Sequence, residues 1–249
     1  MEVKKTIPYN YLDSVKRIDD YLNNNGDYQD IDSIPVRNSL SYSNGYYIDC
    51  YALFVDIRAS SELPKNHQKR VLAKIYRSYI SELTAVMQSF ENCKEVNIVG
   101  DCVSGIFSCT TKNDVMQPFQ AAYTINGVIK ILNVKLKNKG YKQIAVGIGI
   151  AKGNVLMIQA GYKGSGLNDV VWMGDVVNQA SNLCNLANKN NNGIIVVSDA
   201  VYEDLEGKLG THNIPYQEML NKKSCFDDYY SGNITLTCIS EWLDIKEKR

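Results

Sequence analysis

The alternation of two hydrophobic periods constrains the fold of this chain more than any other feature. Some stretches are rich in aromatic and β-branched side chains, which favour strands, whereas others carry apolar side chains at every third or fourth position, as buried helices do. In chain order these stretches predict a strand at 46–57, a helix at 64–90, two strands that meet at Gly100-Asp101, a helix at 114–137 and a strand at 143–156. The order is therefore strand, helix, strand, strand, helix, strand.

This order predicts an α+β fold, a ferredoxin-like βαββαβ sandwich in which one sheet carries both helices on one face. The remaining sequence predicts C-terminal αβ additions to that core. They are a Gly-rich loop from residue 161, a helix at about 175–189, a strand at 193–198, a short helix and a terminal pair of strands that end near residue 242.

The first 45 residues differ in composition from the rest of the chain. Residues 13–23 place Val15, Ile18 and Leu22 on one side of a predicted short helix that docks on another surface. The following residues, to position 45, are rich in Asn, Asp, Ser and Gly, which predicts a linker or a long surface loop. We therefore divide the chain into an N-terminal helix and linker, residues 1–45, and a folded domain, residues 46–249.

Charge and composition exclude several classes of function. The 249 residues contain 27 Lys plus Arg and 27 Asp plus Glu, so the formal net charge is zero and no nucleic-acid partner is expected. No run approaches the roughly 18 apolar residues of a membrane span, and the N-terminus lacks the apolar segment of a signal peptide. The seven cysteines include no C-x-x-C pair and are expected to be reduced. We expect a cytoplasmic protein without a membrane partner.

Two aspartates stand where apolar runs end. Asp56 closes the first predicted strand, and Asp101 lies at the tip of the predicted hairpin. Because the first and third strands are neighbours in this topology, we expect both carboxylates at one edge of the sheet. Like charges held close together repel, and Mg²⁺ or Mn²⁺ with oxygen ligands would neutralise them. Taken alone, however, each aspartate is more simply interpreted as a turn former or a helix cap.

The residues after Asp56 are suited to binding an anion. Small side chains and backbone N–H groups lead into the start of a predicted helix, where negative charge is favoured. We expect a triphosphate there, with its phosphates completing the coordination of a metal ion. The residues of this predicted cradle are Ile57, Arg58, Ala59, Ser60 and Ser61.

Three sequence blocks resemble the class III nucleotide cyclases, and they follow one another along the chain in the same order as in that family. Residues 146–187 (VGIGIAKGNVLMIQAGYKGSGLNDVVWMGDVVNQASNLCNLA) are similar to the glycine-rich strand and loop of that family and its GD-x-VN-x-A helix start. LFVDIRASS and NIVGDCVSGIF resemble its two metal-binding stretches. The resemblance covers about residues 50–242 and implies that residues 46–249 form a nucleotide cyclase catalytic domain. Diguanylate cyclases and polymerase palms, which share the sandwich, lack the GDVVN block.

The resemblance implies a reaction and the residues that perform it. In the family two divalent cations, Mg²⁺ or Mn²⁺, are held at positions that match Asp56, Asp101 and the backbone carbonyl of Ile57. The ribose 3′-hydroxyl of a nucleoside triphosphate attacks the α-phosphate in line, and pyrophosphate leaves. Asn178, in GDVVN, matches the asparagine that orients the ribose, although an asparagine there can also cap a helix. The catalytic residues implied are Asp56, Asp101 and Asn178.

Three positions depart from the family pattern. Asn182 stands where most members have an arginine that stabilises the transition state, so Arg58 or a lysine of the 222–223 pair supplies the charge, or the site is slow or inactive. Asn97 and Val171 occupy the two base-reading positions. Neither the lysine and aspartate typical of adenine nor the glutamate and cysteine typical of guanine is present, which predicts a different base.

These departures, together with the FVDIRASS form, resemble the pyrimidine cyclases of bacterial Pycsar antiphage systems. Those enzymes make cyclic UMP or cyclic CMP, which activates a separate effector protein. The Asn97 amide offers both a donor and an acceptor, so it can pair with uracil or with cytosine; we favour UTP as the substrate. A bulky neighbour such as Tyr51 would narrow the pocket against purines, although an aromatic side chain in a strand more often belongs to the core.

The resemblance also implies an assembly. In the family each active site combines the metal aspartates of one subunit with the asparagine helix of the other. Because this chain carries both sets, a homodimer with two equivalent composite sites is implied. The alternative is a degenerate domain that binds a nucleotide and regulates a partner without turnover. Asn182 favours that alternative, whereas the retained Asp56, Asp101 and Asn178 argue against it.

Overall fold

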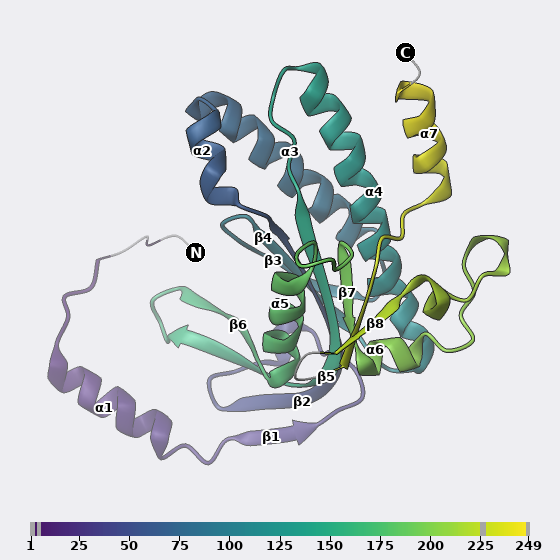
Figure 1. Ribbon diagram of the computed structural model, residues 1–249. Coiled ribbons are helices and arrows are strands. Elements are labelled where there is room, and N and C mark those ends of the chain that lie inside the picture. The colour runs from purple at the N-terminus through teal and green to yellow at the C-terminus, as the bar shows by residue number, and fades with distance from the viewer. Residues whose placement is uncertain (1–2, 4–5, 225–227, 248–249) are drawn as a thin grey trace.

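The computed structural model describes residues 3, 6–224 and 228–247, and within these residues the strands form one nine-stranded sheet (Figure 1). Its hydrogen-bonded order is β3-β4-β2-β5-β7-β9-β8, with β1 paired to β2 and β6 paired to β5. The strands are β1 (Asp27–Asp30), β2 (Asn44–Ile57), β3 (Cys93–Val99), β4 (Cys102–Ser108), β5 (Val146–Tyr162), β6 (Leu167–Met173), β7 (Ile195–Ser198), β8 (Asn221–Ser224) and β9 (Asp228–Gly232).

Four strands form the predicted core. β2 pairs antiparallel with both β4 and β5, and β3 pairs with β4, which gives the spatial order β3-β4-β2-β5. The two long helices, α3 (Lys69–Gln88) and α4 (Met116–Asn138), lie side by side on one face of these strands (Figure 1). This is the ferredoxin-like βαββαβ sandwich, so the predicted fold class is confirmed.

The helices form where the apolar period predicts them. On α3 the side chains of Ile75, Tyr79, Leu83 and Met87 recur every fourth residue and are fully buried. In the predicted helix 114–137 the apolar period predicts one buried stripe, and its residues are all buried: Val115, which immediately precedes α4, and Phe119, Ala122, Ile125, Ile129, Leu132 and Leu136. Extended backbone at residues 67 and 68 separates α3 from the short helix α2 (Leu63–Asn66), so the predicted single helix is divided near its start.

The opposite face of the sheet is covered by α5 (Asp175–Leu186), as Figure 1 shows. The packing there uses small side chains, among them Ala52, Ala151 and Ala180. Gly149 permits the close approach, because a Cβ atom there would lie 2.2 Å from the backbone nitrogen of Cys184. One face of the sheet therefore holds the main core, and the other carries a thin helical cover.

The N-terminal segment is partly ordered on the sheet. β1 runs parallel to the start of β2, and Ile31, Ile34 and Leu40 pack against Ile48 and Met157. Apolar side chains therefore anchor a stretch in which the sequence predicts a linker or a surface loop. The division of the chain at residue 45 stays a prediction.

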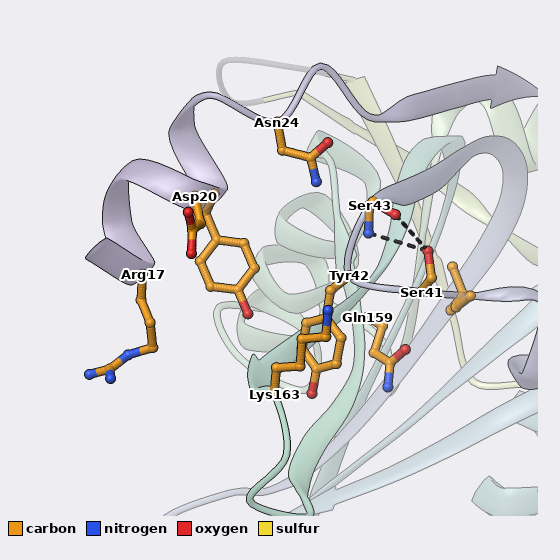
Figure 2. Close-up of a pocket in the computed structure, with 10 residues that line it drawn as sticks. Arg17, Asp20, Asn24, Ser41, Tyr42, Ser43, Gln159 and Lys163 are labelled. Carbon is orange, nitrogen blue, oxygen red and sulfur yellow. Dashed lines mark hydrogen bonds between the residues drawn. The ribbon is translucent and has the colours of Figure 1, made fainter. Parts of the chain in front are cut away.

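Helix α1 (Tyr11–Leu22) contacts the rest of the chain through polar and aromatic side chains, among them Tyr21, whose ring lies near that of Tyr42. A cleft of about 580 Å³ lies between the two, and Figure 2 shows Arg17 and Asp20 of α1 on one side of it and Tyr42, Gln159 and Lys163 on the other. The Arg17 guanidinium lies 4.9 Å from the centre of the Tyr162 ring. The side chains of the predicted apolar stripe of α1 remain more than half exposed.

Other elements differ from their predictions. The Gly-rich loop is the tip of a hairpin between β5 and β6, and α7 (Thr237–Glu247) forms where no helix is predicted. α7 packs on α4 at Gly127, where a Cβ atom would lie 2.6 Å from Ile239. The strand predicted at 193–198 is present as β7, and the short helix α6 (Asp199–Asp204) follows it. The terminal pair of strands, β8 and β9, is present too, but it ends at Gly232 and not near residue 242. Among the described helices, none has the length and hydropathy that crossing a membrane requires.

Candidate active site

Asp56 and Asp101 come together at one end of the sheet. Asp56 is the penultimate residue of β2, and the pairing of β2 with β4 extends to Val55 opposite Val103. Asp101 lies in the two-residue turn that joins β3 to β4. Gly100 precedes it with a φ of 65°, a value that glycine adopts without strain. The strand end and the hairpin tip therefore bring the two carboxyl groups into contact.

The environment of the pair disfavours two negative charges. Burial raises the pKa of Asp56, and repulsion from the adjacent Asp101 carboxylate raises that pKa further, while the charge of Arg58 lowers it. The Oδ2 atom of Asp101 is buried and has no hydrogen-bond partner among the described residues. A buried carboxylate oxygen without a partner is costly. The site is therefore short of positive charge.

These features fit a divalent cation. Among the described residues, no group of three or more His, Cys, Asp or Glu side chains could hold a metal. An ion at Asp56 and Asp101 would take its other ligands from backbone oxygens, water or phosphate, as Mg²⁺ commonly does. The Ile57 side chain is a hydrocarbon buried in the main core, so only the backbone carbonyl of that residue can contribute a ligand.

The predicted phosphate cradle is a tight turn. Ala59 has a φ of 53° and a ψ of 39°, a left-handed conformation that is uncommon for residues other than glycine. A short 3₁₀ turn, Ser60–Glu62, follows, and Leu63 anchors the start of α2 in the core. Ala59 and Ser61 are exposed immediately after the strand that carries Asp56. Phosphate binding by these residues stays a prediction.

Arg58 is directed toward α5. Its Nη2 atom donates to the backbone carbonyl of Cys184 and lies 3.4 Å from the Sγ atom of that residue. Cys184 is in the last turn of α5, where the helix dipole favours a cation. Arg58 therefore supports the end of α5, and its predicted role toward substrate is not tested by this contact.

Asn97 lies on the same face of the sheet as Asp56. The register places Asn97 opposite Ser104, and Ser104 opposite Phe54, so these three side chains share a face. Asp56, two residues after Phe54, points to the same side. Phe54 is half-buried on this face, and the sequence analysis missed it. The strand period of two, counted back from Asp56, would have identified it.

Tyr51 lies on the other side of the sheet. Its side chain is fully buried in the main core beneath α3 and α4, and its hydroxyl donates to the Asp204 carboxylate at 2.7 Å. The same carboxylate forms an ion pair of 2.6 Å with Lys152. The interpretation of Tyr51 as a core residue is therefore confirmed, and the alternative that it narrows the base pocket is wrong, because strand alternation points this side chain away from Asp56.

The remaining predicted residues lie apart from the aspartates. Asn178 and Asn182 are one turn apart on the exposed side of α5. Val171, on β6, pairs with Ile158, which is eleven positions along β5 from the partner of Asp56, Gly147. Among the described residues, no hydrogen bond or ion pair joins Asn178, Asn182 or Val171 to Asp56 or Asp101.

The two lysines named as substitute cations also lie elsewhere. They belong to β8, at the opposite edge of the sheet from the β3–β4 hairpin. Lys222 forms an ion pair of 2.5 Å with Asp228. One chain thus brings together Asp56, Asp101 and the Asn97 face, whereas Asn178, Asn182, Val171 and the two lysines lie apart from the aspartates.

Residues 45–223 match the family described as the adenylate and guanylate cyclase catalytic domain. The chain therefore belongs to the class III nucleotide cyclases. It is 40% identical over 248 residues to the uridylate cyclase of Gulbenkiania mobilis, a match that covers 95% of this chain and 96% of that protein. It is 35% identical over 236 residues to the uridylate cyclase of Treponema porcinum, covering 95% of this chain and 81% of the relative.

Solved structures show the same fold. The adenylyl cyclase CyaB from P. aeruginosa superposes with a TM-score of 0.65 at 18% identity, covering 78% of this chain and 97% of that one. The guanylyl cyclase Cya2 superposes with a TM-score of 0.63 at 13% identity, covering 78% of this chain and 95% of that one. At these identities the similarity concerns the fold alone.

Proposed function

We propose that the protein is a uridylate cyclase, a phosphorus–oxygen lyase that converts UTP to 3′,5′-cyclic UMP and pyrophosphate. The observation that carries this proposal is the 40% identity, over nearly the whole of both chains, to a relative named uridylate cyclase. The contact between Asp56 and Asp101 supports metal-dependent chemistry at this site. Asn97, in place of the charged residues that read purines, supports a pyrimidine base.

The chain supplies the groups that the reaction needs. Asp56, Asp101 and the Ile57 carbonyl would hold two divalent cations, Mg²⁺ or Mn²⁺. When bound, such ions lower the pKa of the 3′-hydroxyl and balance the charge of the polyphosphate. The turn at Ala59–Ser61 binds phosphate oxygens through its N–H groups, and Asn97 contacts the base. A bond forms between the 3′-oxygen and the α-phosphorus, and the bond to pyrophosphate breaks.

A homodimer completes the site in this proposal. Asn178 and Asn182 are exposed on α5, and Val171 is exposed on β6, so a second chain can reach all three. Asn178 would orient the ribose bound at the aspartates of the partner. Asn182 carries no charge, so it cannot replace the arginine of other family members, and we expect modest turnover.

The resemblance to Pycsar cyclases supports a setting for this activity. We propose that cyclic UMP, made in the cytoplasm, is a second messenger in antiphage defence and acts on a separate effector protein. An assay of the purified cyclase with such an effector would test this part independently of the chemistry.

The decisive experiment is incubation of the purified protein with ATP, GTP, CTP and UTP separately, with Mn²⁺ present, followed by mass analysis of the products. Cyclic UMP as the main product supports the proposal. Cyclic CMP as the main product would identify a cytidylate cyclase instead. Bound nucleotide without any product would identify a regulatory module and would make Asn182 the residue that explains the lost activity.

A further inference from the structure

A buried carboxylate lies beside Asn97. The Glu95 side chain is only 4% exposed, although β3 is an edge strand of the sheet. Its Oε2 atom is 3.0 Å from Nη2 of Arg37, and its Oε1 atom accepts a hydrogen bond of 3.2 Å from Nδ2 of Asn97. Arg37, from the N-terminal segment, also pairs with Asp169 on β6 at 3.1 Å. Both oxygens of Glu95 are therefore engaged.

Local backbone geometry directs Glu95 to this position. The register between β3 and β4 shifts between Cys93 and Glu95, so Glu95 pairs with Ile106, and Asn97 pairs with Ser104. Such shifts re-aim side chains at sheet edges. Here the shift places Glu95 and Asn97 on the face that carries Asp56. Arg37 thus joins three segments far apart in the sequence, because it contacts Glu95 on β3 and Asp169 on β6.

This contact fixes the orientation of the Asn97 amide. Only the NH₂ group can face the Glu95 carboxylate, because the amide oxygen in that place would meet a negative charge. The Oδ1 atom therefore points away from Glu95. No described residue donates a hydrogen bond to Oδ1. Asn97 thus presents an acceptor, and a second N–H, in one fixed order.

Uracil and cytosine differ in the order of these groups. At positions 3 and 4 uracil offers an N–H donor beside a carbonyl acceptor, whereas cytosine offers a nitrogen acceptor beside an amino donor. An amide held in one orientation matches one of these edges and opposes the other. A half-turn of the amide would reverse the preference, so a free asparagine can serve both bases.

We propose that Glu95, held by Arg37, is a positioning residue that makes the enzyme discriminate between uracil and cytosine by preventing rotation of the Asn97 amide. This inference rests on the proposed pyrimidine cyclase function. It adds a specificity determinant that does not touch the base, and it gives the N-terminal segment a role in substrate selection through Arg37.

The test compares kcat/KM for UTP and for CTP in the full-length wild type and in Glu95→Gln, with Mn²⁺ present. Glutamine can accept from, or donate to, either orientation of the Asn97 amide. We expect the discrimination ratio to fall at least about tenfold, mainly through a gain with the disfavoured base, since one mismatched pair of base contacts corresponds to a factor of this size. Equal losses with both substrates, and an unchanged ratio, would overturn the proposal.

Two further variants keep the result interpretable. Glu95→Asp retains the charge but is shorter by one methylene, so it cannot reach Arg37 and Asn97 together. Glu95→Asp should therefore also lower the ratio of kcat/KM between the favoured and the disfavoured base. If Glu95→Gln does not fold, this variant tests the proposal in its place. Glu91→Gln, an exposed glutamate before the same hairpin, should leave the ratio unchanged. A wild type that makes no cyclic pyrimidine nucleotide counts against the proposed function, whereas an active wild type with unchanged ratios in the variants counts against this inference alone.

Discussion

Two pairs of acidic side chains on the face of the sheet that carries Asp56 differ in how their charge is balanced. We call Glu95 and Asp169 the balanced pair, and Asp56 and Asp101 the unbalanced pair. Glu95 and Asp169 are bridged by Arg37, at 3.0 and 3.1 Å. Asp56 and Asp101 contact each other, and the nearby Arg58 is hydrogen-bonded to the carbonyl of Cys184. Arg37 thus supplies the cation of the first pair, whereas in the second pair the Oδ2 atom of Asp101 is buried without a hydrogen-bond partner among the described residues.

The difference separates a structural cluster from a binding site. A buried carboxylate with its own cation and a second hydrogen bond is complete, and it can hold neighbouring groups in place. Two adjacent carboxylates with too little positive charge are incomplete and gain most from an added ion. Variants that remove one charge at a time should therefore act on activity at Asp56 and Asp101, and on stability at Arg37.

The largest effect is expected at the unbalanced pair. Asp56→Ala or Asp101→Ala should reduce turnover by about 10³-fold or more, because the metal ions that bind the polyphosphate lose a ligand. Product formation from UTP with Mn²⁺ measures this, and circular dichroism checks that the fold is retained. Glu91→Gln is the matched control and should keep full activity. Full activity in either alanine variant would remove the two-metal mechanism.

At the balanced pair the expected loss is one of stability. Arg37→Ala leaves the buried Glu95 carboxylate without its cation and should lower the free energy of unfolding by about 2 kcal/mol. The value is below that of a fully buried pair, because the Arg37 side chain is 56% exposed. Urea unfolding measures it. The added change Glu95→Gln should restore most of the loss, and equal instability of the double variant would contradict the charge explanation.

Local sequence was sufficient to predict the core of the fold and the meeting of Asp56 with Asp101. Both follow from short-range signals, namely apolar period and strand order, which fix the ends of β2 and of the β3–β4 hairpin. The stripe on α4 was predicted residue by residue for the same reason. Such signals survive in a single sequence because each depends on neighbours within a few positions.

The rest depends on contacts between distant segments. Arg37, Glu95 and Asp169 come from three separate stretches, so no spacing in the sequence relates them. The aromatic character of Tyr51 left two interpretations open, pocket or core, and the alternation of β2 places its side chain in the core. α7 is short, and it is held by a close approach to α4 that only the folded chain shows.

In metal-free protein, the unbalanced pair should also show a smaller effect on stability. The pKa of Asp56 is raised by burial and by Asp101, so the protonated form is favoured in the folded state. This contribution is fully present below the ordinary pKa of an aspartate and is lost as the pH rises through the raised pKa. Above that range Asp56→Asn should be more stable than the wild type, by on the order of 1 kcal/mol.

Thermal unfolding with a chelator, followed by addition of Mn²⁺, measures this effect. The ion should raise the Tm of the wild type and should have much less effect on Asp56→Asn. A wild type that is more stable than the variant without metal would show that the two carboxylates do not repel.

The smallest effect on stability is expected at Asp169, the more exposed acid of the balanced pair. Asp169→Asn removes one of the two anions that bind Arg37. The Asp169 side chain is 45% exposed, and Arg37 retains its ion pair with Glu95. Exposed ion pairs contribute little, so the free energy of unfolding should fall by less than about 1 kcal/mol. The UTP-to-CTP ratio should stay close to that of the wild type, because Glu95 still holds the Asn97 amide. A double-mutant cycle of Asp169→Asn with Arg37→Ala, measured by urea unfolding, isolates this pair. A coupling free energy as large as the loss of unfolding free energy in Arg37→Ala would mean that Arg37 stabilises the fold through Asp169 rather than through Glu95.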